Sequence, residues 1–580
     1  MGETEEPTLM QAQSIIVIHP GSLYLKIGRA SDLNPHTELH ALARRRLNGD
    51  LSPHTDRLLP PIVCKLKDIE AELDKCRLSI SHCLQSCPMS DGQRRYATPP
   101  QQIAQYNRRS RPEPVNNSII TDWVKPEADV VVGAEVLNIN PEWDYNIHFP
   151  IKRGELNIHA GVGGSLTAVL ADLECIWGWV IQTKLHIQLQ DLKNYRAVLV
   201  IPDIYNRQYL RELTNMLLQM GFSSCFLLQD HVGATFGAGL GTACVVDCGH
   251  SKTSVSCVED GITQPATRVR LPYGGGDITQ CLFWLLNKCG FPYKDCNPLL
   301  PLDALLLEKF KQESCHVDLD VCGCRERSFI INQPQREPVR YTVQVGDECM
   351  IAPLSLFQPE LLNLTGPKVM VTQKRNTGDP SDPHDSDYLR ETGRKGKEAP
   401  EAAADGGGSA PADEEIVDIE MTGDAEFNAG PPSQLLSIDQ AILQSIQRCA
   451  SDDLKKKMYS CILVVGGGMK FRGISNWLQK KISLQIPPNF RPEQTDIVTT
   501  PMDPMIVAWK GAAILACLES AHELWITKAE WEKYAVKVLR ERSPFIWRRS
   551  VGEICTGILV LTLLEEIMRI IFMIRHIWNI

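Results

Sequence analysis

The sequence Val245-Val246-Asp247-Cys248-Gly249-His250-Ser251 places an apolar strand directly before a glycine-containing turn. Strands predicted over Ala243–Asp247 and Thr253–Val258 make this stretch a hairpin. A similar stretch, Ile16-Val17-Ile18-His19-Pro20-Gly21-Ser22, stands near the start of the chain, between strands predicted over Ser14–Ile18 and Leu23–Ile27. Turns of this kind present backbone N–H groups that can hold phosphate oxygens. Each turn alone is a weak signal, because most glycine turns only connect strands.

A third glycine turn, Gly466-Gly467-Gly468, follows a buried strand predicted over Cys461–Val465 and precedes a helix predicted near Ile474–Ile482. Such a turn suits the close approach of a planar or phosphorylated ligand. Alternating strands and helices predict an α/β fold. The further elements predicted are a helix over Leu166–Leu185 with Ser165 as its N-cap, a strand over Ala197–Ile201, and a helix over Arg207–Met220 that ends at Gly221.

Several common catalytic motifs are missing from the sequence. It contains no Gly-x-x-x-x-Gly-Lys-Ser/Thr, no His-Glu-x-x-His and no Gly-x-Ser-x-Gly. Gly161-Val162-Gly163-Gly164 superficially resembles a dinucleotide-binding turn, but no clear strand precedes it. The three glycine turns on separate α/β units are therefore the main functional signal.

The charge of the chain is concentrated in one segment. The 580 residues carry a net charge of -10, and residues 376–430 alone hold 15 acidic and 4 basic residues, which leaves 55 acidic and 56 basic residues elsewhere. Residues 376–433 are rich in Gly, Pro, Ala, Asp and Glu, so we predict a disordered acidic insertion. It is either a solvated linker or an acidic segment that attracts basic partners such as histones.

A basic, irregular region is predicted over about 30–127. It includes Arg44-Arg45-Arg46, Arg94-Arg95, and Arg108-Arg109 with Arg111, so contact with nucleic-acid phosphates is one interpretation. A solvated basic loop is the other, because Asp68, Glu70, Glu72 and Asp74 lie in the same region.

The cysteines and the hydropathy of the sequence indicate in which cellular compartment the protein is expected and whether it crosses a membrane. The 20 cysteines include no Cys-x-x-Cys pair, and no secretory signal stands at Met1–Met10, so reduced thiols in the cytosol or nucleus are expected. The apolar C-terminus has an uncharged run of only eleven residues, Ile554–Leu564. A membrane-spanning helix needs about 20 apolar residues, so no membrane span is expected.

The glycine turns and several further segments resemble the actin family. The resemblance covers most of Ser14–Trp547 outside the two insertions, and the C-terminal stretch Met505–Tyr534 is its most specific part. It implies an actin-like fold: two RNase H-like α/β domains around a nucleotide cleft. The other segments that carry it are Phe149–Gly154, Ala243–Gly261, Lys311–Asp320 and Leu463–Ile474.

The resemblance also implies a division of the chain. It comprises an N-terminal tail (1–14), a first domain (15–240) with the basic insertion, and a second domain (241–505) with the acidic insertion. Residues 506–547 return into the first domain. Residues 548–580 form an apolar extension outside the family match, which we interpret as a non-native tail.

Within the family, the chain is similar to the nuclear members that are subunits of the INO-eighty chromatin-remodelling complex. This implies a nuclear, non-polymerising, structural subunit with implied roles in transcription, DNA repair and recombination. Its implied partners are a helical segment of the remodelling ATPase, nuclear actin, another actin-related protein, and nucleosomes, histones or linker DNA. An insertion in the small domain, where actin carries a loop needed for filaments, argues against polymerisation.

The resemblance implies a site for ATP, in which magnesium would be held weakly at Asp247. His19 and His250 stand where actin has carboxylates, so little catalysis is expected: no catalytic residue, and at most weak ATPase activity. The position for the attacking water falls at Gln229 or Asp230. The nucleotide-binding residues implied by the resemblance are Ser22, Leu23, Asp247, Cys248, Gly249, His250, Lys311, Gly467 and Gly468.

Proteins with two other functions have the same fold. A sugar kinase or chaperone-type ATPase would need a carboxylate that acts as a base near the transferred phosphate, and Asp247 could serve. A cytoskeletal actin relative would form filaments.

Overall fold

The structure of the protein is a computed structural model. The structure describes residues 11–46, 54–62, 67–116, 120–365, 369–373, 435–492, 496–498, 500, 502–543 and 546. The predicted acidic insertion and the apolar extension 548–580 lie outside these residues.

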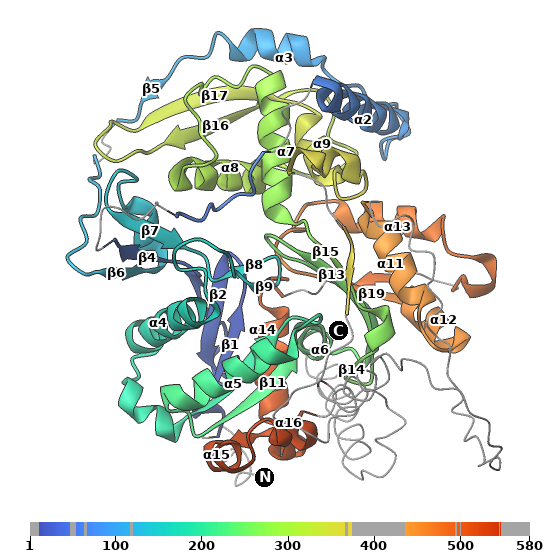
Figure 1. Ribbon diagram of the computed structural model, residues 1–580. Coiled ribbons are helices and arrows are strands. Elements are labelled where there is room, and N and C mark those ends of the chain that lie inside the picture. Colours follow the sequence, from blue (N-terminus) through green and yellow to red (C-terminus); the bar gives the residue numbers. More distant parts are fainter. Residues whose placement is uncertain are drawn as a thin grey trace, which may run out of the picture.

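A six-stranded sheet combines strands from the beginning of the described chain with one strand from its C-terminal part (Figure 1). The first predicted hairpin is confirmed in it: β1 pairs antiparallel with β2, with Ile18 opposite Ile27. β1 also runs parallel to β10, with Val17 opposite Val198. The strand order is β21 (Ile526–Thr527), β11 (Ser224–Gln229), β10 (Arg196–Ile201), β1 (Ile15–Pro20), β2 (Tyr24–Arg29) and β3 (His36–Leu39).

A seven-stranded sheet repeats this plan in the second half of the chain. The second predicted hairpin, β12 with β13, is again extended by a parallel strand, here β19. The order is β18 (Val371–Thr372), β15 (Val269–Leu271), β13 (Thr253–Glu259), β12 (Thr242–Cys248), β19 (Cys461–Val465) and β20 (Asp496–Val498), and β14 (Ile262–Thr263) pairs with β13.

Two helices, α6 (Asp230–Gly237) and α14 (Val507–Ala516), cross between the sheets (Figure 1). Their crossing is very close, because a side-chain carbon at Gly511 would lie on the Gly233 carbonyl oxygen and 2.5 Å from the Gly237 nitrogen. The Trp509 indole donates a hydrogen bond to the Val17 carbonyl (3.0 Å), which ties α14 to β1. Side chains from both sheets and both helices form one apolar core here.

Further helices cover the outer faces of the sheets. On the first sheet, α4 (Leu166–Lys184) begins at Ser165, whose hydroxyl accepts from the Ala168 N–H, and α5 (Arg207–Met220) ends at Gly221 with φ 113°. Both predictions are confirmed. The other described helices outside residues 30–127 are α7 (Gly275–Lys288), α8 (Pro301–Ser314), α9 (Glu348–Leu354), α11 (Ile438–Gln447), α12 (Asp452–Ser460), α13 (Ile474–Ser483), α15 (Lys528–Tyr534) and α16 (Lys537–Arg542). The 3₁₀ segments are η1 (Gly133–Asn138), η2 (Leu189–Asn194), η3 (Pro265–Thr267), η4 (Pro359–Thr365), η5 (Pro488–Phe490) and η6 (Glu519–Leu524).

Three small sheets complete the fold. They are β16 (Arg325–Ile331), β17 (Val339–Val345) and β5 (Glu113–Pro114); β6 (Val130–Val132), β4 (Leu42–Arg45) and β7 (Tyr145–His148); and β8 (Ile151–Lys152) with β9 (Glu155–Leu156).

The prediction of an irregular region over 30–127 is wrong for much of its described length. The region holds β3, β4, the 20-residue helix α2 (Lys67–Ser86) and α3 (Pro100–Asn107). α2 contacts η4 and α9, and α3 contacts β17 (Figure 1). The helix escaped prediction because its buried stripe is narrow: Leu73, Ile80 and Leu84 face the core among many polar residues.

Two of the compositional predictions can be compared with the structure. The 18 described cysteines are free thiols, nine of them buried. Among the described helices, none combines the length and the apolar character that a bilayer crossing requires.

Candidate functional site

A cleft of about 460 Å³ lies where the turns of the two hairpins face the Gly466–Gly468 turn. Of the nine residues predicted to bind nucleotide, eight line it: Ser22, Leu23, Asp247, Gly249, His250, Lys311, Gly467 and Gly468. Cys248 does not. Its side chain points into the core, where its thiol accepts from the Thr253 hydroxyl (3.3 Å) and burial raises its pKa to about 12.

The turns present free backbone donors to the cleft. Among the described residues, the N–H groups of Ser22, Leu23 and His250 have no acceptor, although nearby N–H groups do. Gly249 donates to the Lys252 carbonyl (2.8 Å), and Gly468 donates to the Cys248 carbonyl (2.7 Å). The bonded N–H groups fix the shape of the turns, and the free ones can hold phosphate oxygens.

The Gly466–Gly468 turn has to be glycine because it touches the end of β12. Gly466 has φ 87°, and a side-chain carbon there would lie 2.5 Å from Asp247 Oδ1. A side-chain carbon at Gly468 would lie 2.6 Å from the Gly249 carbonyl oxygen. The glycine run therefore brings the two turns into backbone contact at the wall of the cleft.

The first turn is held by His40, a buried residue on the chain between β3 and β4. Its Nδ1 donates to the Gly21 carbonyl (2.7 Å), and its Nε2 accepts from the Trp177 indole (3.3 Å). This pairing requires the neutral ring, and burial lowers the pKa of His40 to about 4.

We expect His40 to make the protein sensitive to acid. The ordinary pKa of histidine is about 6.5, so the unfolded chain takes up a proton below that pH while the folded chain resists until about pH 4. The stabilisation by neutral His40 is therefore complete above pH 6.5, and about 3 kcal/mol is lost by pH 4. Melting temperatures of wild type and His40→Asn between pH 7 and pH 4 measure this, with exposed His82→Asn as the control. Equal pH dependence of wild type and His40→Asn would contradict it.

Two lysines that the sequence analysis did not single out line the inner end of the cleft. Lys252 Nζ lies 2.8 Å from Asp230 Oδ2, 3.4 Å from Asp247 Oδ2 and 3.1 Å from Ser254 Oγ. Burial alone would lower the pKa of Lys252, but Asp230 and Asp247 outweigh it and raise it to about 12. The Lys26 ammonium has no hydrogen-bond or ion-pair partner among the described residues, and burial lowers its pKa.

These residues do not fit the magnesium ion expected at Asp247. The Asp247 carboxylate already faces the Lys252 ammonium, and a neighbouring divalent cation would be repelled by it. His19 and His250 supply no carboxylate, and burial, together with Lys26, lowers the pKa of His19 well below its usual value. Magnesium prefers carboxylate and water oxygens.

The side chains of the two candidates for the water-positioning residue point in different directions. Asp230 lines the cleft. Gln229 is buried, and its side chain donates to Asp203 Oδ1 (3.2 Å) and accepts from the Thr263 hydroxyl (3.4 Å). Of the two, only Asp230 therefore faces the cleft.

Lys311 is held by neighbours that the sequence analysis also missed. Its Nζ lies 2.7 Å from Glu308 Oε2 and donates to the Gly275 carbonyl (2.8 Å). Burial raises the pKa of Glu308, but Lys311 and His250 outweigh it, and the pKa lies below its usual value. His250 Nε2 donates to the Leu58 carbonyl (2.9 Å). The sequence could have predicted this pair, because Glu308 and Lys311 lie three residues apart, one turn of α8.

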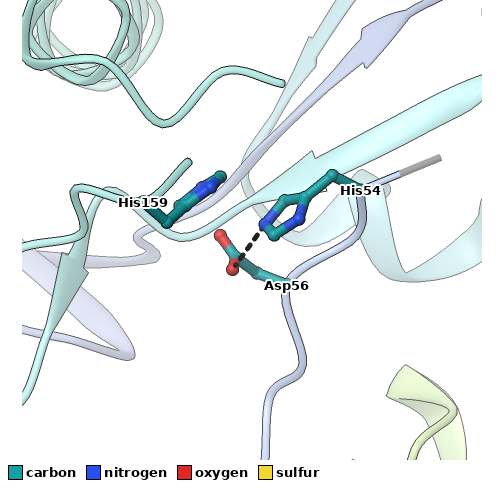
Figure 2. Close-up of side chains that lie close together, drawn as sticks. All are labelled: His54, Asp56 and His159. Carbon is teal, nitrogen blue, oxygen red and sulfur yellow. Dashed lines mark ion pairs between the residues drawn. The ribbon is translucent and has the colours of Figure 1, made fainter. Parts of the chain in front are cut away.

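The glycine turn 161–164 does not line this cleft and packs against His54, His148 and His159. Figure 2 shows His54 and His159 beside each other, with Asp56 close to His54. The rings of His54 and His159 are stacked with centroids 3.9 Å apart, and Asp56 Oδ1 lies 3.5 Å from His54 Nε2. A side-chain carbon at Gly161 would lie 2.7 Å from His54 Nδ1. Close packing explains these glycines without a dinucleotide.

Several arginines of the basic region are engaged within the fold. Arg95 is fully buried and pairs with Asp347 (3.0 Å). The other engaged pairs are Arg44 with Asp172, Arg45 with Asp129, and Arg46 with Asp144. The exposed arginines among the described residues of this region are Arg45, Arg57, Arg94, Arg108, Arg109 and Arg111.

Comparisons with known proteins agree with this geometry. The family model described as actin matches residues 10–297 and 303–544. Actin-related protein 8 of Aedes aegypti is 54% identical over 559 residues, covering 94% of this chain and 99% of that protein. Human actin-related protein 8 is 41% identical over 583 residues, covering 93% of each chain.

A solved structure extends the likeness to three dimensions. The structure of human actin-related protein 8 in its ATP-bound state superposes with a TM-score of 0.79 at 39% identity, and the match covers 92% of this chain and 97% of that one. The predicted resemblance and the actin-like fold are thus confirmed. The chain belongs to the actin family.

Proposed function

We propose that the protein is a non-polymerising nuclear actin-related protein that binds ATP and serves as a structural subunit of a chromatin-remodelling complex of the INO-eighty type. The observation that supports this most strongly is similarity over nearly the whole chain to actin-related proteins 8, one of them solved with ATP bound. Its partners would be a helical segment of the remodelling ATPase, nuclear actin and another actin-related protein.

The cleft supports the nucleotide part of the proposal. Ser22, Leu23 and His250, whose N–H groups have no acceptor among the described residues, line it together with Lys26 and Lys252. Backbone donors and fixed cations are the groups that hold a polyphosphate. The adenosine end would lie towards Lys311 and the Gly466–Gly468 turn.

The same cleft argues against an enzyme. A phosphotransferase would use Asp247 as its base, but the Asp247 carboxylate is already engaged by the Lys252 ammonium, whose nitrogen lies 3.4 Å from Oδ2. We therefore propose a structural role with at most weak ATPase activity. Contacts with histones or linker DNA would use exposed arginines of the basic region, such as Arg108, Arg109 and Arg111.

Affinity purification of the tagged full-length protein from nuclear extract tests the proposal. We expect nuclear actin, a second actin-related protein and a large remodelling ATPase to co-purify. The isolated protein should stay in the supernatant after centrifugation with salt and magnesium, and turn over ATP below the usual enzyme range of about 1 to 1,000 per second. Purification without these partners, or pelleting as filaments, would refute the proposal.

A further inference from the structure

The inner end of the cleft holds an ammonium group between two carboxylates. Asp230 is the first residue of α6, Asp247 lies at the end of β12, and Lys252 follows in the turn between β12 and β13. The Lys252 side chain is only 14% exposed, and those of Asp230 and Asp247 are 6% and 19% exposed. The three charges therefore meet where solvent screens them weakly.

The position of this ammonium is fixed from several sides. Besides the two carboxylates, the Ser254 hydroxyl accepts from Lys252 Nζ at 3.1 Å. Asp230 is itself held, because its Oδ1 accepts from the His231 N–H at 2.9 Å. The Lys252 carbonyl accepts from the Gly249 N–H, so the residue also shapes the phosphate-facing turn. Lys252 is thus part of the wall of the cleft.

The charges at this end suit a polyphosphate only because of the lysines. Asp230 and Asp247 alone would repel phosphate oxygens, and Lys252 and Lys26 bring the sum of the four side chains to zero. In a cleft that organises a divalent ion, the carboxylates face the metal. Here one of them pairs at 2.8 Å and the other at 3.4 Å with an ammonium that belongs to the chain.

We propose that Lys252 takes the place of a divalent cation, so that the protein binds ATP through the ammonium groups of Lys252 and Lys26 without requiring magnesium. This inference rests on the proposed binding of ATP. An ammonium neutralises phosphate charge, but it cannot act as a Lewis acid or activate a bound water as a metal does. The replacement of a divalent cation by the Lys252 ammonium therefore favours retention of the nucleotide over its hydrolysis.

The test measures ATP affinity of the nucleotide-stripped full-length protein by calorimetry, once with magnesium and once with EDTA. We expect the wild-type Kd to differ by less than about tenfold between the two buffers. Lys252→Met should weaken binding in EDTA by about 100-fold or more, because it leaves the Asp230 and Asp247 carboxylates without their counter-charge beside the phosphates. Magnesium should restore much of the loss in Lys252→Met, and Lys252→Arg should bind in EDTA nearly as well as wild type.

Exposed Lys309→Met is the matched control, and melting temperatures show that each variant is folded. Loss of ATP by the wild type in EDTA, or unchanged binding by folded Lys252→Met in EDTA, overturns the role of Lys252 while leaving ATP binding intact. Failure of the wild type to bind ATP in either buffer overturns the proposed nucleotide function and this inference together.

Discussion

Gly511→Ala is expected to prevent the protein from folding stably. The added methyl group would fall on the Gly233 carbonyl oxygen and 2.5 Å from the Gly237 nitrogen, both of them backbone atoms of α6. Backbone cannot move aside as the end of a long side chain can, so α6 and α14 would have to separate. Overpacking typically costs about 1–3 kcal/mol, and we expect more than 3 kcal/mol here because both sheets pack against these helices.

The yield of soluble protein and its melting temperature measure this effect. Gly178→Ala is the matched control, because Gly178 lies inside α4 and a methyl group there would meet only Leu189 at an ordinary 3.7 Å. The control should be neutral or stabilise by up to about 1 kcal/mol, since alanine favours helix more than glycine does. A Gly511→Ala protein as stable as this control would contradict the close crossing.

Arg95→Met is expected to destabilise the protein by about 3–5 kcal/mol. The Arg95 guanidinium is fully buried, donates to the Leu319 and Val321 carbonyls (3.0 and 2.7 Å), and pairs with Asp347. Burial already raises the pKa of Asp347 despite this partner. Removal of Arg95 leaves a buried carboxylate without its counter-charge and two carbonyls without donors.

Chemical denaturation of the two neighbouring arginine variants measures this difference. Arg94 precedes Arg95 but is exposed, so Arg94→Met should change stability by less than about 0.5 kcal/mol. Equal effects of the two substitutions would show that Arg95 is not the anchor of this segment. The pair also separates structure from recognition, because only the exposed arginine is available to an outside phosphate.

Local patterns in the sequence were enough to predict much of the framework. The hairpins β1–β2 and β12–β13, the helix α5 and its end at Gly221 all follow from residues near one another in the chain. α2 was missed, because its apolar stripe is narrow and its partners η4 and α9 lie far away in the sequence. The packing of α6 on α14 is likewise non-local.

The turns of the candidate site were predicted from the sequence, but the arrangement of its charged side chains was not. Glycine turns are visible as short motifs that carry part of the family resemblance, and eight of the nine residues implied by that resemblance line the cleft. Cys248 was placed wrongly because side chains alternate along β12: Asp247 faces the cleft and Cys248 the core. Lys252 gave no motif, since its importance arises from Asp230 on α6, which only the folded chain brings near.

The bond between the Trp509 indole and the Val17 carbonyl spans 492 residues, and β21 completes the edge of the sheet that begins with β1. During synthesis at about 5–20 residues per second, the N-terminal strands would leave the ribosome about 25–100 seconds before these partners exist. The N-terminal sheet cannot be completed until α14 and β21 have been synthesised, and its unpaired strand edges stay exposed until then. Biogenesis is therefore the stage at which this chain most needs chaperones, and late stop codons should be more damaging than their small share of the sequence suggests.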